Sequence, residues 1–208
     1  KSYEDGSLID NRIDPMDANG TGHVPAMTIP QSNALSTASI AALKLAKEYK
    51  KEWNELRDKE CPKKLNAAAR EELPGIRKCR AVTFQKTRWY KDVMEQYKVD
   101  ITEKTIGGVV TDIYTPVVGI STKNRNRVLM HLHGGAHYLG SRWVGYRAAP
   151  PIAVMAGIKV ISVDYRQWPE ATHPAAVEDV VTVYKNLLKD YKPENIGIYG
   201  CSSGGFYA

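Results

Sequence analysis

The stretch that decides the fold is NIGIYGCSSGGFYA, residues 195–208. A short apolar run ends at Gly200 and leads directly into the pattern G-x-S-x-G, residues 200–204. In this pattern the serine sits on a sharp turn between a strand and a helix, and the glycines remove Cβ atoms that would clash there. The turn would present the hydroxyl of Ser202 at the carboxyl edge of a sheet. The pentapeptide alone does not establish this, since a plain tight loop or a phosphate-binding loop has a similar composition.

A second glycine motif, HGGA at residues 133–136, follows the apolar run RVLMHLH. Successive glycines allow two backbone N–H groups to point into one space, as stabilisation of a tetrahedral oxyanion requires. The amides of Gly134 and Gly135 are therefore candidate oxyanion donors. The amide of Ser203, which follows the candidate nucleophile Ser202, is the third. The two motifs occur in the order that this chemistry needs.

Three histidines around the second motif keep a metal site open as an alternative. His131 and His133 would lie on one face of a strand and His137 follows four residues later, a pattern compatible with zinc. No carboxylate or further histidine follows closely enough to complete a hydrolytic metal centre. We therefore favour the oxyanion loop and expect His131 to pack in or beside the sheet.

The chain before residue 96 divides into two parts. Residues 1–36 are rich in Gly, Pro, Asp and Asn and sustain no period, which predicts an irregular N-terminal arm. Residues 37–95 predict a helical segment, because apolar side chains recur three or four residues apart along its first part. A short second helix is predicted over 63–75, ending at its Pro-Gly pair, and a third over 87–97.

Residues 96–208 have the pattern of an α/β domain, the N-terminal half of a hydrolase core. Two alternating runs, 98–104 and 107–116, predict an antiparallel pair joined near a Gly-Gly turn. Short, nearly continuous apolar strands then alternate with helices, which predicts βαβ units and a doubly wound, mostly parallel sheet covered on both faces. The strands are expected at 127–133, 158–165 and 195–200, and the helices at about 144–156 and 175–190.

Composition restricts the classes of partner. The 208 residues carry a net charge of +6, but Lys and Arg are interleaved with Asp and Glu, as in residues 47–60, which predicts a solvated helix face and no nucleic-acid surface. No apolar run approaches the ~20 residues that a membrane span needs. Cys61 and Cys79 could pair in an oxidising compartment, leaving Cys201 unpaired. Together with the start at Lys1, this possible disulfide favours a periplasmic or secreted protein.

Three blocks together resemble one known family. HLHGGAHY (131–138), VISVDYRQWPEATHPAAVEDV (160–180) and GIYGCSSGG (197–205) are similar to hormone-sensitive-lipase-like carboxylesterases of the α/β-hydrolase superfamily. The resemblance covers residues 114–208. It implies an α/β-hydrolase sheet, incomplete in this sequence, with an N-terminal helical cap.

The resemblance assigns roles position by position. Ser202 matches the nucleophile, and Gly134 and Gly135 match the oxyanion loop. Ser203 occupies the third donor position, where the family more often has Ala. His133 would organise the loop and transfer no proton. The resemblance gives a structural role to Asp164, Tyr165 and Arg166. It places Glu178 and Asp179 on the following helix and gives them no catalytic role.

The catalytic triad would be completed after the nucleophile. In this family the chain order is serine, then an acidic residue, then histidine. Only six residues follow Ser202, so the acid and the histidine are expected beyond Ala208. We expect the chain to be the N-terminal part of a longer hydrolase whose remainder belongs to the same or a second chain. The resemblance also leaves room for a homodimer.

The sequence thus predicts a serine carboxylesterase that hydrolyses small-molecule esters through an acyl-enzyme on Ser202, with no metal or organic cofactor. The helices before residue 74 would form part of a cap over the site or simply pack against the core. A catalytically silent binding protein of the same fold is the alternative. A dinucleotide-binding fold is disfavoured, because residues 197–205 lack G-x-G-x-x-G.

Overall fold

The computed structural model describes residues 34–61 and 71–208, and the chain forms two compact units, Lys1–Ala42 and Leu43–Ala208. The described part of the first unit contains the beginning of helix α1 (Thr37–Glu60), whose bounds confirm the helix predicted from residue 37. The hydroxyl oxygen of Ser36 accepts a hydrogen bond from the amide of Ser39 at 3.1 Å and so caps this helix start. The predicted arm lies, over residues 1–33, outside the described residues.

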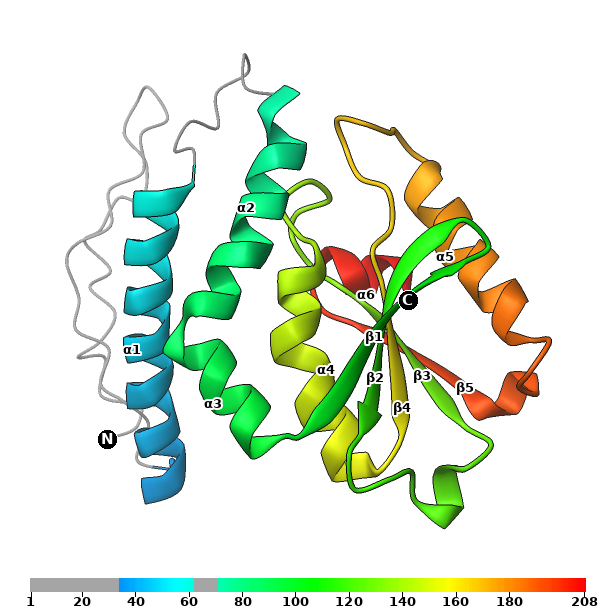
Figure 1. The fold of residues 1–208 in the computed structure, drawn as a ribbon, viewed down its shortest axis with the longest axis horizontal. Helices are drawn as coiled ribbons and strands as arrows, with labels where there is room; N and C mark the ends of the chain where they lie inside the picture. The colour runs from blue at the N-terminus through cyan, green and yellow to red at the C-terminus, as the bar shows by residue number, and fades with distance from the viewer. Residues whose placement is uncertain (1–33, 62–70) are drawn as a thin grey trace, which may run out of the picture. The chain divides into compact units, whose positions relative to one another are not determined.

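The second unit is built on a five-stranded mixed sheet in the order β1-β2-β4-β3-β5 (Figure 1). Strands β1 (Val99–Ile106) and β2 (Val109–Pro116) pair antiparallel, from Val99 opposite Pro116 to Ile106 opposite Val109. Gly107 and Gly108 close this hairpin with φ angles of 60° and 90°, which glycine adopts at no steric cost. The predicted antiparallel pair is therefore confirmed.

The other three strands form the parallel part of the sheet, as predicted. Strand β3 (Val128–Leu132) lies between β4 (Lys159–Val163) and β5 (Ile196–Gly200) and runs parallel to both. Because β2 pairs antiparallel with β4, the hairpin extends the parallel sheet on one side. The carboxyl ends of β3, β4 and β5 therefore lie at one edge, where α/β folds place their binding sites.

The two faces of the sheet are covered by different helices (Figure 1). Helix α5 (Ala175–Leu187) packs on one face, where side chains from alternate positions of β3 form a buried cluster with it. Helix α4 (Arg142–Ala156) packs on the opposite face, and His131 in β3 is turned away from the α5 cluster. The alternation follows from the two-residue period of a strand. The β3 and α5 members of the first cluster are Val128, Met130, Leu132, Ala176, Val180, Val183 and Leu187.

An aromatic cluster joins the N-terminal helices to α4. Trp53 of α1 lies 5.5 Å, between ring centroids, from Phe84 and 5.4 Å from Trp143 of α4. Phe84 is fully buried and Trp53 is 6% exposed. Packing against the core, one of the two roles predicted for the helices before residue 74, is therefore observed for α1. Leu43, one of the recurring apolar side chains in the first part of α1, is 46% exposed.

The second helix starts at the Pro-Gly pair that was predicted to end it. Helix α2 spans Leu73–Lys86, with Pro74 in its first turn, so the prediction that the Pro-Gly pair halts a helix is wrong. Proline is tolerated at this position, because the N–H that it lacks would have no intrahelical acceptor there. The rest of the predicted helix falls on residues 62–70, outside the described residues. Helix α3 (Arg88–Gln96) confirms the third predicted helix.

A disulfide joins Cys61, just after α1, to Cys79 in α2, and Cys201 is a free, exposed thiol. The pairing considered from the sequence is therefore present, and it anchors the two helices to each other.

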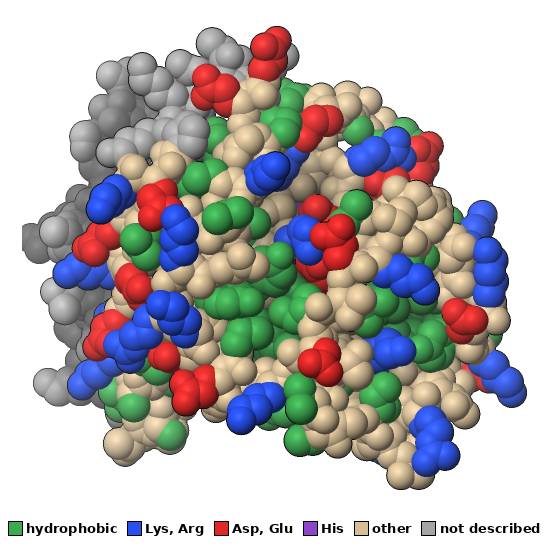
Figure 2. Space-filling view, viewed as in Figure 1, with side chains coloured by type: hydrophobic (Ala, Val, Ile, Leu, Met, Phe, Trp, Pro, Cys, Tyr) green, Lys and Arg blue, Asp and Glu red, His purple; other side chains and the backbone are tan. Residues whose placement is uncertain are grey.

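Opposite charges are mixed on the visible face of the described residues (Figure 2). On the N-terminal helices, Lys86 pairs with Glu60 at 2.6 Å and Arg88 pairs with Asp92 at 3.2 Å. This agrees with the predicted solvated helix face. Among the helices of the described residues, none combines the length and apolar character needed to cross a membrane.

The buried imidazole of His131 makes stability depend on pH. Its Nδ1 lies 2.9 Å from the Ser162 hydroxyl, and burial lowers its pKa to about 3. An unfolded histidine titrates near pH 6.5, so between these values the unfolded state binds more protons and the free energy of unfolding falls as pH falls.

We predict that the wild type loses about 2 kcal/mol more stability than His131→Asn between about pH 6.5 and about pH 5. Asparagine retains a hydrogen-bonding group but does not titrate, so the variant isolates the histidine from the carboxylates. Urea unfolding of the full-length proteins measures the difference. Equal pH dependence in the two proteins would contradict a neutral, buried His131.

Candidate active site

Ser202 lies on the turn between β5 and the short helix α6 (Ser203–Tyr207), and its side chain is exposed. Its φ of 55° and ψ of −127° are strained for a residue with a Cβ atom. The turn requires glycine on both sides, because a Cβ at Gly200 would lie 2.4 Å from the carbonyl group of Gly204. A Cβ at Gly204 would lie 2.0 Å from the carbonyl oxygen of Leu132 at the end of β3. The geometry is that of a nucleophile elbow.

The HGGA loop lies directly against this elbow. A Cβ built on Gly134 would meet the carbonyl oxygen of Cys201 at 2.6 Å and the Cβ of Ser202 at 3.3 Å. Within residues 34–61 and 71–208, no protein acceptor binds the amides of Gly134, Gly135 or Ser203. The structure therefore brings the four predicted site residues together, with three unused N–H donors beside one exposed hydroxyl.

The loop turns back on itself immediately after the glycine pair. The carbonyl oxygen of Gly135 accepts hydrogen bonds from the amides of Tyr138 at 3.1 Å and Leu139 at 2.7 Å. Ala136 and His137 both have positive φ angles, 53° and 66°, which non-glycine residues seldom adopt. Such strain persists only where surrounding contacts impose it. Residues 133–140 form this loop, termed the oxyanion loop after the role predicted for Gly134 and Gly135.

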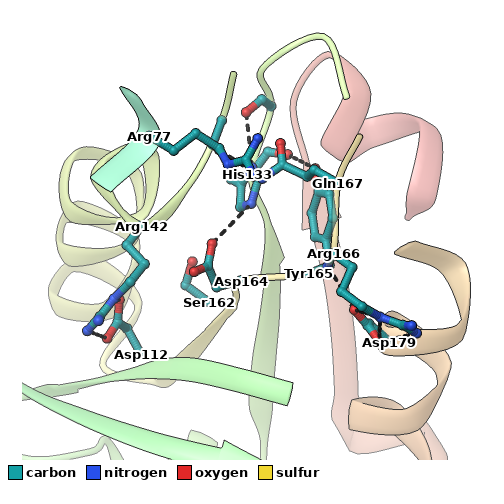
Figure 3. A network of polar contacts seen from close by, with 12 residues as sticks. Arg77, Asp112, His133, Arg142, Ser162, Asp164, Tyr165, Arg166, Gln167 and Asp179 are labelled. Carbon is teal, nitrogen blue, oxygen red and sulfur yellow. Dashed lines mark hydrogen bonds and ion pairs between the residues drawn. The ribbon is translucent and has the colours of Figure 1, made fainter. Parts of the chain in front are cut away.

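Two side chains from the segment after β4, Tyr165 and Gln167, hold the oxyanion loop through its carbonyl groups (Figure 3). The hydroxyl of Tyr165 donates to the carbonyl oxygen of His133, and the two rings stack with centroids 4.2 Å apart. Burial raises the pKa of Tyr165 above its ordinary value, so the hydroxyl remains a donor. The amide of Gln167 donates to the carbonyl oxygen of Gly140 at 2.9 Å.

His133 is enclosed by these contacts and is 1% exposed. Its Nδ1 lies 3.1 Å from the carbonyl oxygen of Gly134, and its Nε2 lies 3.7 Å from a carboxylate oxygen of Asp164. The ring thus faces the oxyanion loop on one edge and the end of β4 on the other. These positions suit a residue that fixes the loop conformation.

The three histidines of the metal alternative do not converge. His131 contacts Ser162 inside the sheet layer, whereas His137 is exposed, with Nδ1 2.7 Å from the hydroxyl of Tyr207. Among the residues that the structure describes, no group of three or more His, Cys, Asp or Glu side chains could hold a metal ion. The zinc alternative therefore lacks a ligand cluster in this part of the chain.

The segment after β4 is itself tied to the core by an ion pair. The Nε of Arg166 lies 2.9 Å from the carboxylate of Asp179 in α5, and the backbone amide of Arg166 donates to the same carboxylate at 2.8 Å. Asp179 is 6% exposed, so this pair fixes the strand end against the helix. This contact agrees with the structural role predicted for Arg166 and with the expectation that Asp179 is not catalytic.

Sequence reasoning missed two residues that contact the oxyanion loop. Gln167 follows the D-Y-R block directly, so its place after a strand end was a usable signal. Arg77 of α2 donates to the carbonyl oxygen of Tyr138 at 2.9 Å, and no sequence signal indicated it. A cavity of about 570 Å³ lies between α2 and the strand ends, and Arg77, Asp164 and Gln167 are among its lining residues.

The close approach of α6 to β3 generates a stability prediction. Gly204→Ala should lower the free energy of unfolding by about 3 kcal/mol, because the new methyl group overlaps the Leu132 carbonyl oxygen. The matched control is Gly75→Ala in α2, where nothing lies within 4 Å and alanine should add ~0.5 kcal/mol of stability. Chemical denaturation of both full-length variants tests this. Similar stability of the two variants would contradict the contact.

Comparison with known proteins agrees with this geometry. Residues 129–208 match the family described as the alpha/beta hydrolase fold. A Mycobacterium tuberculosis protein called LipR is 43% identical over 79 residues, which cover 37% of this chain and 25% of that protein. An acetyl-hydrolase of Streptomyces hygroscopicus is 38% identical over 79 residues, covering 38% of this chain and 26% of that protein.

Solved structures share the fold over a larger part of the chain. A crystal structure of an esterase superposes with a TM-score of 0.65 at 24% identity, covering 90% of this chain and 54% of that one. An esterase of the bacterial hormone-sensitive lipase family gives 0.54 at 23% identity, covering 77% and 49%. The matches thus span about a quarter of these curated relatives and about half of the solved chains. Residues 129–208 thus match the α/β-hydrolase fold family, and over this part the chain is similar to curated relatives that include an acetyl-hydrolase.

Proposed function

We propose that the protein is a serine carboxylesterase in which Ser202 is the nucleophile and the amides of Gly134, Gly135 and Ser203 form the oxyanion hole. One observation carries the proposal: Ser202 is exposed on a strained elbow, and the backbone of Gly134 packs so closely against it that a Cβ there would lie 2.6 Å from the carbonyl oxygen of Cys201. A reacting carbonyl at Ser202 would then lie beside amides that have no protein acceptor in the described part of the chain.

The proposed reaction follows from the chemistry of a serine hydroxyl. The Oγ of Ser202 attacks the ester carbonyl carbon while a general base accepts the hydroxyl proton, and the developing oxyanion is stabilised by the three amides. The alcohol leaves with that proton, and an acyl-enzyme remains on Ser202. Water, deprotonated by the same base, then releases the acid. The relatives named as an acetyl-hydrolase and as esterases support this class of substrate.

The general base and its acidic partner are proposed to lie outside the described residues. A serine hydroxyl is a poor nucleophile without a base within hydrogen-bond reach. In the part of the chain that the structure describes, the Ser202 hydroxyl makes no hydrogen bond. His133 is unsuited to the task, because its two nitrogens face Gly134 and Asp164 and its ring is buried under the loop.

Substitution of Ser202 tests the proposal. In the full-length protein, Ser202→Ala should lower kcat for p-nitrophenyl acetate by about 10⁴-fold or more, because the acyl-enzyme cannot form. Ser203→Ala is the matched control: it removes a neighbouring hydroxyl but keeps the proposed oxyanion amide, so most activity should remain. Steady-state kinetics of the three proteins give the answer.

Two results would count against the proposal. Ester hydrolysis by Ser202→Ala at the wild-type rate would exclude Ser202 as the nucleophile. A wild-type protein that binds small esters but does not turn them over would favour the catalytically silent binding protein instead.

A further inference from the structure

We infer that Arg77 of α2 is a positioning residue that holds the oxyanion loop in its reactive conformation, an inference that rests on the proposed esterase function. Its side chain is 9% exposed and extends from α2 toward the loop (Figure 3). One terminal nitrogen donates to the carbonyl oxygen of Tyr138 at 2.9 Å and to that of Trp168 at 3.3 Å. The other terminal nitrogen pairs with the carboxylate of Glu170.

These partners come from the two segments that build the site. Tyr138 belongs to the oxyanion loop, and Trp168 and Glu170 belong to the segment after β4 that also supplies Tyr165 and Gln167. The guanidinium therefore joins both segments to a third element, α2. An arginine suits this place because its planar fork offers five donors and no acceptor, and the neighbouring acceptors are two carbonyls and a carboxylate.

Helix α2 provides a rigid anchor for this contact. Ile76 and Phe84 are 1% and 0% exposed, and Cys79, two residues after Arg77, is joined by the disulfide to Cys61. A buried charge is tolerated only when it is paired and hydrogen-bonded, so the three acceptors and Arg77 depend on one another. The oxyanion loop is thus held against α2, which is itself fixed by its buried side chains and by the disulfide.

The contact acts where the loop is most strained. Tyr138 follows Ala136 and His137, the two residues with positive φ angles, and its amide donates back to Gly135. Loss of the Arg77 contact would let this turn relax and shift the amides of Gly134 and Gly135. Those amides are needed chiefly in the transition state, so the loss should lower kcat and leave KM nearly unchanged.

The experiment uses the full-length protein with p-nitrophenyl acetate. Arg77→Met keeps most of the buried side-chain volume but removes the donors, and Arg77→Lys restores a single donor group. Arg88→Met is the matched control, because Arg88 is an exposed arginine on α3 whose guanidinium pairs with the surface carboxylates of Glu48 and Asp92 and lies over the Tyr49 ring. A fluorophosphonate titrates Ser202 in each preparation, so that kcat is expressed per reactive site and unfolded molecules do not count.

We expect kcat per titrated site to fall about ten- to hundred-fold in Arg77→Met, with KM within about twofold of the wild type. Arg77→Lys should recover part of the loss, and Arg88→Met should match the wild type. If Arg77→Met yields no titratable protein, the kcat of Arg77→Lys tests the inference. A kcat equal to that of the wild type would contradict it.

The failures of the inference and of the proposed function are distinguishable. If the wild type hydrolyses the ester, Ser202→Ala does not, and Arg77→Met retains the wild-type kcat, then only the positioning role is wrong. The same holds if Arg77→Met raises KM with kcat unchanged. A wild-type protein without esterase activity overturns the proposed function and, with it, this inference.

Discussion

The arrangement of the site depends on one close backbone contact, the approach of the HGGA loop to the turn that carries Ser202. No side chain fits between Gly134 and the carbonyl of Cys201, since a Cβ there would lie at 2.6 Å. The same is true where α6 meets β3, at Gly204 and Leu132. Two glycine-dense segments, residues 133–140 and 200–205, therefore converge at the carboxyl edge of the parallel strands. The parallel order of β3 and β5 brings their ends together, and glycine allows the last approach.

The contacts that hold the loop use its carbonyl groups and leave its first amides unused. Tyr165, Arg77 and Gln167 bind the carbonyls of His133, Tyr138 and Gly140 respectively. A loop fixed in this way keeps its geometry without consuming the donors of Gly134 and Gly135. Preorganised donors of this kind need no reorganisation as negative charge develops. The helices before β1 thus have two roles. Trp53 and Phe84 pack on Trp143 of α4, and Arg77 contacts the oxyanion loop.

The elements that have a local sequence pattern could be predicted from the sequence. Two-residue alternation predicted the hairpin, short apolar runs predicted β3, β4 and β5, and the glycine motifs predicted which turns meet. The end of the second helix was predicted wrongly at Pro74, because a proline can follow the end of one helix or lie in the first turn of another. Pro74 lies in the first turn of α2. Sequence reasoning also missed Arg77, whose partners include two backbone carbonyls on segments distant in the chain. Every residue has a backbone carbonyl acceptor, so a contact of this kind requires no particular residue type and cannot be recognised in the sequence.

The most direct test of the central claim is a crystal structure of the full-length protein after reaction with a fluorophosphonate. We predict a single covalent bond from the phosphorus to Oγ of Ser202. We also predict that a phosphonyl oxygen lies about 2.7–3.1 Å from the amide nitrogens of Gly134, Gly135 and Ser203. An adduct on Ser203 or Cys201, or a Ser202 adduct whose oxygen points away from these amides into solvent, would contradict it.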